Sequence, residues 1–500
     1  MSVPAPDNAL RRAALTGIRW SAMKNWLAQA IAVGTVLVMA RLLGPAEFGL
    51  YSIASAIIFI GGTFADQGFS VALVQRHEVT ERDFHSVFWL SLLLAGMLAL
   101  LTVAVSGPLA LWFDAPQLRG VIVAIAPAIP LMAASGVLNA SLTRNLRFKS
   151  LTVLSVLSAA GGAVLGIAMA FGGYGVWSLV GQVLAGNLLG LIGGFAITRY
   201  RPRALFDSEA IRELWRFGLW SLAGDMAGQV SQRSIPLLIG SFFGPAVVGL
   251  YGLARRLVEV LQFFVTAPIA QVAVPVMAKL QDERVRAATV ARNGLQALFA
   301  IVAPLFTLVG LLGPEGLVWL LGEHWRAAAP LVPPLSVAAL FGCLSWYITA
   351  VLLALGHPRK RLALQLFSFL GAVSALVILR EGGISTVAWG LASISLLVAL
   401  LGVGMLASVV PLAPLRLVTA IGAALPALAL MVAAAAGICS ESADIHVVLR
   451  LFVASGPAVA LYAAGLIFFA PRLVARILDL VPFDLPLPRF VRTRLAVAGS

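Results

Sequence analysis

Six charged side chains stand inside apolar stretches of this 500-residue chain: Asp66, Asp225, Arg233, Arg255, Arg256 and Glu259. A charge at the centre of a membrane costs at least about 2.5–3.5 kcal/mol, so such a residue is a candidate for function. Half of the set are arginines, whose planar guanidinium groups bind phosphate through paired hydrogen bonds. The set therefore predicts a binding site for an anion, in the first place one that carries phosphate.

Spacing from a shared turn places these arginines at a common depth. Arg233 lies eleven residues before Gly244 and Arg255 eleven after it, so both stand about 16 Å from the turn, near the bilayer centre. Glu259 follows Arg255 by four residues and shares a helix face with it. One carboxylate cannot balance three guanidinium groups, and the positive excess predicts an anionic ligand. The alternative, in which Glu259 pairs with one arginine only to fix helix packing, stays open.

Other polar residues extend this candidate site. Glutamines on the same stretches are predicted to line the same cavity, and they are Gln229, Gln232 and Gln262. A second group near the helix entrances holds candidates for salt bridges or for coupling to an ion, namely Lys24, Asn25, Asp66 and Asp225, with Glu259 added from the central tier. Neither the five histidines nor the two cysteines have metal-ligand spacing, so we expect no metal site, no catalytic residue and no cofactor.

The composition decides which elements must carry these residues. Apolar residues make up 60% of the chain and charged residues only 11%, with a mean hydropathy of +0.98. A soluble domain carries roughly 25% charged residues, so a soluble enzyme, a disordered chain and a coiled coil are excluded. The composition predicts an all-α membrane protein that crosses the bilayer many times.

About 14 stretches are long and apolar enough to span a bilayer. They do not alternate as the strands of a barrel would, so helices are predicted. The stretches are 20–43, 48–75, 84–106, 118–140, 151–172, 174–198, 214–240, 246–278, 288–312, 328–355, 362–379, 384–410, 415–437 and 447–470.

The positive charges predict how the chain is oriented. With the N-terminus in the cytoplasm, most of the 35 Lys and Arg residues fall in cytoplasmic loops, as the positive-inside rule requires. Both termini are then cytoplasmic, and the basic tail would lie near anionic lipid. Because membrane topology accounts for the net charge of +14, no nucleic-acid partner is predicted.

An internal repeat relates the two halves. Residues 20–54 align without gaps with residues 220–254, and Gly44-Pro45-Ala46 matches Gly244-Pro245-Ala246. Both copies have the same direction in the membrane, which is typical of transporters that expose a site between two lobes alternately to each side. The counterparts of Arg233, Arg255 and Arg256 are Val33, Ser55 and Ala56, so the predicted cationic face belongs to the second copy.

Six segments are predicted from the spans and the repeat. They are a cytoplasmic N-terminal segment (1–19), an N-lobe of six helices (20–200), a cytoplasmic linker (201–213), a C-lobe of six helices (214–410), two further helices (411–470) and a cytoplasmic tail (471–500).

Several motifs resemble those of the Wzx-type polysaccharide flippases, in particular the branch similar to colanic acid exporters. They occur in order as Ala40–Tyr51, Gly68–Arg76, Val87–Leu90, Thr143–Lys149, Gly173–Trp177, Gly322–Trp325 and Leu353–Gly356. The resemblance covers roughly residues 10–400 and places the chain near the polysaccharide transporter family, within the multidrug/oligosaccharidyl-lipid/polysaccharide (MOP) exporter superfamily, which includes the multidrug (MATE) transporters.

The resemblance implies transport rather than enzymatic catalysis. The expected activity is flipping of an oligosaccharide linked to undecaprenyl diphosphate, for exopolysaccharide or lipopolysaccharide biosynthesis. The expected location is the bacterial inner membrane, and the expected partners are membrane lipid and, as further candidates, a polysaccharide polymerase and glycosyltransferases. No site residue is carried over from the resemblance, because the cavity residues of the family are not fixed by a tight motif.

Three other functions remain as alternatives. A cation-coupled multidrug exporter of the MATE type would need an acidic cavity, opposite in sign to the arginine excess. A flippase for the lipid II peptidoglycan precursor would share the fold and the diphosphate chemistry. A membrane glycosyltransferase or polymerase would need a long outer loop, and the longest here has about sixteen residues.

Overall fold

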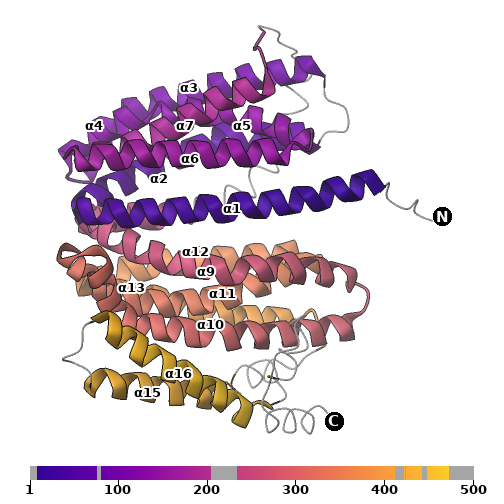
Figure 1. The fold of residues 1–500 in the computed structure, drawn as a ribbon, viewed down its shortest axis with the longest axis vertical. Helices are drawn as coiled ribbons and strands as arrows, with labels where there is room; N and C mark the ends of the chain where they lie inside the picture. Colours follow the sequence, from indigo (N-terminus) through magenta and orange to yellow (C-terminus); the bar gives the residue numbers. More distant parts are fainter. Residues whose placement is uncertain are drawn as a thin grey trace. The chain divides into compact units, whose positions relative to one another are not determined.

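The computed structural model describes residues 8–75, 80–203, 233–411, 424–441 and 447–471, together with residues 422 and 474. Across these ranges the chain forms helices joined by short turns, and no strand is present in them (Figure 1). The chain divides into two compact units, Met1–Gly252 and Leu253–Ser500, each with its own packing.

The first unit contains the helices of the first repeat. They are α1 (Asn8–Leu42), α2 (Pro45–Gln75), α3 (Glu81–Trp112), α4 (Pro116–Ile125), α5 (Ala128–Arg144), α6 (Phe148–Phe171) and α7 (Val176–Thr198), followed by the short helix Arg233–Phe243 and the first residues of α9 (Pro245–Lys279). α1 begins twelve residues before the predicted span, which starts at residue 20. An apolar stretch predicts only the part of a helix that would lie in hydrocarbon, and the helix can continue beyond it.

The second unit continues from α9 with the helices of the second repeat. They are α10 (Arg284–Leu321), the 3-10 helix η1 (Glu323–Leu331), α11 (Val332–Ala354), α12 (Pro358–Leu379), the 3-10 helix η2 (Arg380–Gly382) and α13 (Gly383–Ala407). Two further helices, α15 (Leu425–Glu441) and α16 (Val447–Phe469), pack against each other and against α10.

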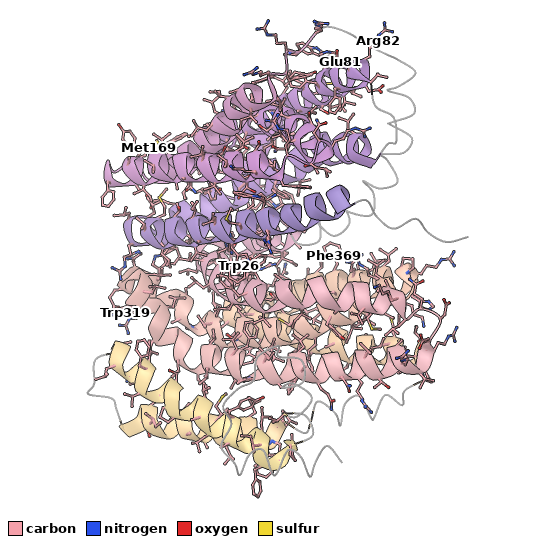
Figure 2. All side chains as sticks on the ribbon, turned by 45° about the vertical axis from the view of Figure 1, so that its right-hand side comes forward. Trp26, Glu81, Arg82, Met169, Trp319 and Phe369 are labelled. Carbon is pink, nitrogen blue, oxygen red and sulfur yellow. The ribbon has the colours of Figure 1, made fainter. Side chains whose placement is uncertain are left out.

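Ten stretches of the described residues are long and apolar enough to cross a membrane, and one of them, Pro358–Ala407, holds both α12 and α13. Most of the predicted span 214–240 and the first part of 415–437 lie outside the described residues. Large apolar side chains remain exposed on helix surfaces, such as Trp26 (47% exposed) and Trp319 (46%), whereas Glu81 and Arg82 mark the polar start of α3 (Figure 2). Apolar surface of this kind is suited to lipid, and the prediction of an all-α polytopic membrane protein is confirmed.

Proline changes two of the predicted spans. The stretch 118–140 is two helices, α4 and α5, which are separated at Ala126 and Pro127 because proline offers no N–H to the preceding turn. The stretch 328–355 begins with the 3-10 residues of η1, which include Pro330, before α11 starts. The apolar pattern alone did not reveal these breaks.

The two repeats use the same helix pairs. In the first, α5 packs on α3, α6 and α7, and α6 packs on α7; in the second, α11 packs on α10, α12 and α13, and α12 packs on α13. α5 and α11 also end in the same way: Leu146 (φ 53°) and Gly356 (φ 79°) are left-handed, and the residue after each donates its N–H to a carbonyl five residues earlier. The repeat predicted from residues 20–54 is thus accompanied by matching contacts among four helices of each unit, α3, α5, α6 and α7 in the first and α10, α11, α12 and α13 in the second.

Side chains satisfy the backbone at the ends of these helices. Arg144 donates to the carbonyl of Leu73 at the end of α2 (2.9 Å). In the second unit, Gln281, just after α9, donates to the carbonyl of Ala354 at the end of α11 (2.7 Å). The last carbonyls of a helix have no hydrogen-bond partner within that helix. These side-chain bonds supply one and at the same time attach the helix end to a neighbouring element.

A reciprocal contact joins the turn of the first repeat to the turn of the second within the first unit. A Cβ atom added at Gly49 would fall on the carbonyl of Pro245, and one added at Gly249 would fall on the carbonyl of Pro45. The start of α2 and the start of α9 thus cross backbone to backbone, which only glycine permits. The matched Gly-Pro-Ala turns therefore form one packing element.

We expect Gly49→Ala to destabilise the protein by about 1–3 kcal/mol, because the methyl group collides with backbone that cannot move aside. Thermal unfolding in detergent would show this as a lower midpoint. The matched control is Gly96→Ala in α3, where no atom lies within 4 Å of the added carbon. An unchanged midpoint in Gly49→Ala would contradict the crossing.

Candidate functional site

Three of the six charged candidates, Arg255, Arg256 and Glu259, lie on α9. Nε of Arg255 is 2.6 Å from Oε1 of Glu259, one helical turn further along, and the two side chains are 24% and 39% exposed. The ion pair predicted as an alternative from the i, i+4 spacing is therefore present. Because it is partly open to the surroundings, it can exchange partners when an anion approaches.

Arg256, next to this pair, is half-buried, and the described residues give it no carboxylate partner. Arg255, Arg256 and Glu259 together keep one positive charge in excess. Guanidinium groups bind phosphate oxygens through charge-assisted hydrogen bonds, and α9 carries two of them in succession, at Arg255 and Arg256. This part of α9 can thus hold an anion without help from a metal.

Gln262 continues the polar face of α9 and lies against α11. A Cβ atom built on Gly342 would come within 3.2 Å of its Nε2 atom. The absence of a side chain at Gly342 leaves room for the amide, which neighbours the buried Cys343. Gln262 is thereby placed on the same helix as the arginines, at the packing surface with α11.

Arg233 has a different environment, at the start of the short helix Arg233–Phe243 in the first unit. Its Cζ atom stands 4.0 Å from the ring centroid of Phe59 on α2, a cation–π contact worth about 0.5–2 kcal/mol. The side chain is half-buried. Residue spacing could not reveal this partner, because Phe59 is distant in the sequence.

The remaining candidates are described only in part. Lys24 is half-buried and Asn25 exposed, both on α1. The backbone of Asp66 lies in α2, but its side chain is outside the described set. The structure does not describe three of the candidates, namely Asp225, Gln229 and Gln232. The lower tier and the two glutamines therefore stay predictions.

An ion pair that the sequence did not reveal attaches the C-terminal helices. Arg450 on α16 pairs with Glu315 on α10, and the side chain of Arg450 is only 14% exposed. The hydroxyl of Tyr462 donates to the carbonyl of Ala300 on α10, at 3.0 Å. The two partners lie 135 residues apart in the chain, so no local sequence signal indicated the pair.

Comparison with known proteins places these features in a family. The family model described as polysaccharide biosynthesis protein matches residues 38–330. The chain is 28% identical to the succinoglycan biosynthesis transport protein ExoT of Rhizobium meliloti (strain 1021), over 64% of this chain and 65% of that protein. It is 22% identical to the lipopolysaccharide biosynthesis protein WzxC of Escherichia coli (strain K12), over 74% of this chain and 76% of WzxC.

Two solved structures share the fold. The lipid II flippase MurJ in an inward closed conformation superposes with a TM-score of 0.71 at 12% identity, covering 91% of this chain and all of MurJ. An inward-facing multidrug transporter of the MATE family, in the MOP superfamily, gives a TM-score of 0.60 at 18% identity, covering 77% of this chain and 94% of that one. The predicted MOP fold is confirmed. Since the family model covers more than half of its length, the chain belongs to the polysaccharide biosynthesis protein family.

Proposed function

We propose that this protein flips oligosaccharide repeat units linked to undecaprenyl diphosphate across the bacterial inner membrane, from the cytoplasmic to the outer leaflet. Family membership, the names of its relatives and the MOP fold support transport of a polysaccharide precursor. The observation that supports an anionic ligand is the positive excess on α9, where Arg256 follows the Arg255 of the Arg255–Glu259 ion pair in the sequence.

The diphosphate is the part of the substrate that hydrocarbon excludes most strongly. Arg255 and Arg256 would replace its lost hydration with charge-assisted hydrogen bonds, and Gln262 would donate to an oxygen of the headgroup. The prenyl chain stays in lipid throughout, because transfer of its apolar surface into water would be unfavourable. Conformational exchange then exposes the headgroup first to one face of the membrane and afterwards to the other.

The membrane potential assists this direction of movement. An anion that crosses from the cytoplasm to the outside moves away from the negative interior. Each unit of negative charge gains about 2.3 kcal/mol per 100 mV in this direction. Glycosyltransferases that supply the substrate and a polymerase that consumes it are the proposed functional partners, while the protein itself makes and breaks no glycosidic bond.

The function is tested in a strain that lacks this protein. We expect undecaprenyl-diphosphate-linked oligosaccharide to accumulate with its headgroup on the cytoplasmic side, because synthesis continues while export stops. Extracted lipid-linked sugar, with its sidedness measured in oriented membrane vesicles, is the readout. Normal amounts in the outer leaflet of the deletion strain would contradict the proposal.

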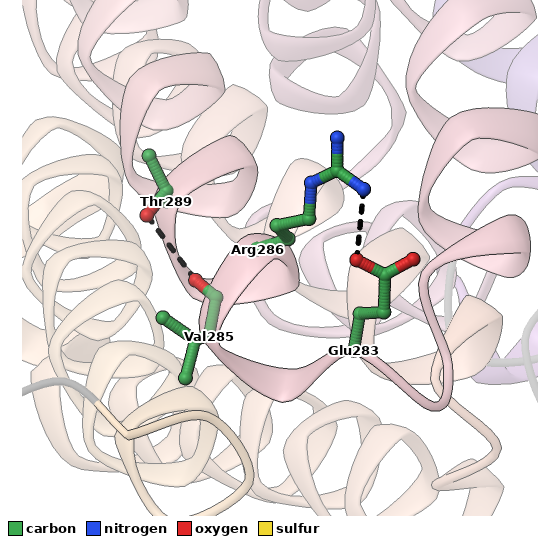
Figure 3. Close-up of polar contacts among 4 residues, drawn as sticks. All are labelled: Glu283, Val285, Arg286 and Thr289. Carbon is green, nitrogen blue, oxygen red and sulfur yellow. Dashed lines mark hydrogen bonds and ion pairs between the residues drawn. The ribbon is translucent and has the colours of Figure 1, made fainter.

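Arg256→Gln tests the site itself. We expect at least a tenfold loss of flipping rate in proteoliposomes, because one charge-assisted contact to the diphosphate disappears. The control is Arg286→Gln at the start of α10, where the guanidinium is 76% exposed and pairs with Glu283 at 2.9 Å (Figure 3). A similar rate in both variants, with equal amounts of folded protein, would remove Arg256 from the site.

Glu259→Gln tests the competition for Arg255. The carboxylate and a phosphate oxygen need the same guanidinium donors, so we expect the variant to bind the substrate more tightly and to release it more slowly. Flipping rates measured over a range of substrate densities should then show a lower KM together with a lower kcat. A loss of kcat with a raised KM would instead show that Glu259 holds Arg255 in its binding position.

A further inference from the structure

Arg203, in the segment that follows α7, is held against α3 by two hydrogen bonds of its backbone. Its backbone N–H donates to Nδ1 of His85 (3.2 Å), and its carbonyl accepts from Nε1 of Trp89 (3.0 Å). His85 and Trp89 are four residues apart on α3 and thus lie on one face of the helix. Both sides of the Arg203 backbone are therefore clamped by side chains from one helix.

Tyr200 completes this clamp. Its hydroxyl lies 2.7 Å from Nδ1 of His85, and its ring stacks on the imidazole with 5.1 Å between centroids. Burial raises the pKa of the Tyr200 hydroxyl to about 12, so the oxygen keeps its proton at neutral pH and acts as the donor. Phe88 on α3 and Phe195 on α7 pack around the Tyr200 ring.

The geometry fixes the protonation state that the clamp needs. Two donors, the Arg203 amide and the Tyr200 hydroxyl, converge on one nitrogen, which must offer its lone pair. A proton on Nδ1 would remove that acceptor. The Tyr200 oxygen can turn and accept instead, but the amide of Arg203 has only a hydrogen to donate and loses its partner.

We propose that His85 is a proton-operated clamp on the segment that follows α7: neutral His85 holds the Arg203 peptide on α3, and protonated His85 releases it. Histidine is the side chain that changes charge closest to physiological pH. Release frees the Arg203 backbone just after the end of α7. The clamp thus decides whether Arg203 stays attached to α3, whatever substrate the protein carries.

Charged groups on the surrounding elements act on this proton in opposite directions. Asp83, two residues before His85 on α3, favours the protonated ring, although its carboxylate already accepts the backbone N–H of Thr80 (2.8 Å). Guanidinium groups oppose protonation, and they are those of Arg144 at the end of α5, which packs on α3, and of Arg199, Arg201 and Arg203 in the clamped segment. The described part of α7 carries no charged residue.

Hydrogen–deuterium exchange of the full-length protein in detergent tests the clamp, read from peptides that contain Arg203 and corrected for the intrinsic effect of pH. We expect protection of this amide to fall roughly tenfold between about pH 7.5 and pH 5.5, the effect of losing one hydrogen bond. His85→Asn is the matched variant, because its amide oxygen takes the place of Nδ1 and does not titrate. Protection should then be the same at both pH values.

His85→Phe keeps a ring against Tyr200 but offers no acceptor, so the Arg203 amide should exchange fast at both pH values. Peptides from α12 and α13 serve as the reference for global folding. The proposal is overturned if His85→Asn loses protection with falling pH as the wild type does, or if the wild type shows no protection at pH 7.5. Should His85→Phe fail to fold, the comparison of wild type with His85→Asn decides by itself.

Discussion

A bilayer core offers no water to a peptide group, so every backbone N–H and C=O inside it must find its partner in the protein. Helices satisfy all of these groups except those at their ends. Long polar side chains of this protein form hydrogen bonds with backbone groups at several of these ends. Arg144 caps α2 and Gln281 caps α11 by donating to their last carbonyls. Near the start of α2, the carboxylate of Glu47 accepts the N–H of Gly44 (2.6 Å), and its other oxygen would lie 2.7 Å from a Cβ at Gly175.

The same constraint explains which parts of the fold could be predicted. Apolar runs of the right length identified the spans, and the matched Gly-Pro-Ala turns identified the repeat, because both are local in sequence. The break at Pro127 was missed because the apolar pattern continues through it. For the site, the i, i+4 spacing was enough to anticipate the Arg255–Glu259 pair. The contact of Arg233 with Phe59 could not be anticipated, because tertiary packing alone brings α2 beside it.

Several motifs behind the family resemblance form the frame of the fold, by which we mean its helix ends and turns. The motif Thr143–Lys149 supplies the cap on α2 and the left-handed turn at Leu146. Glu47, in the motif Ala40–Tyr51, lies against Gly175 of the motif Gly173–Trp177. Residues that cap helices or form turns are constrained by backbone geometry, whatever the ligand. A resemblance based on them therefore identifies the fold and the family well but says little about the ligand.

Ligand recognition has to come from positions that the frame leaves free, and the repeat shows where those are. α2 and α9 begin with the same turn and cross through the same glycines, yet Ser55 and Ala56 stand in α2 where Arg255 and Arg256 stand in α9. Both helices fold, so the frame does not require guanidinium groups at this depth. A charge that is costly in hydrocarbon and unnecessary for folding is retained for an interaction, and on α9 the excess is positive. The duplicated turn and glycine crossing therefore occur in both copies, while only α9 carries the guanidinium groups that we propose bind an anionic headgroup.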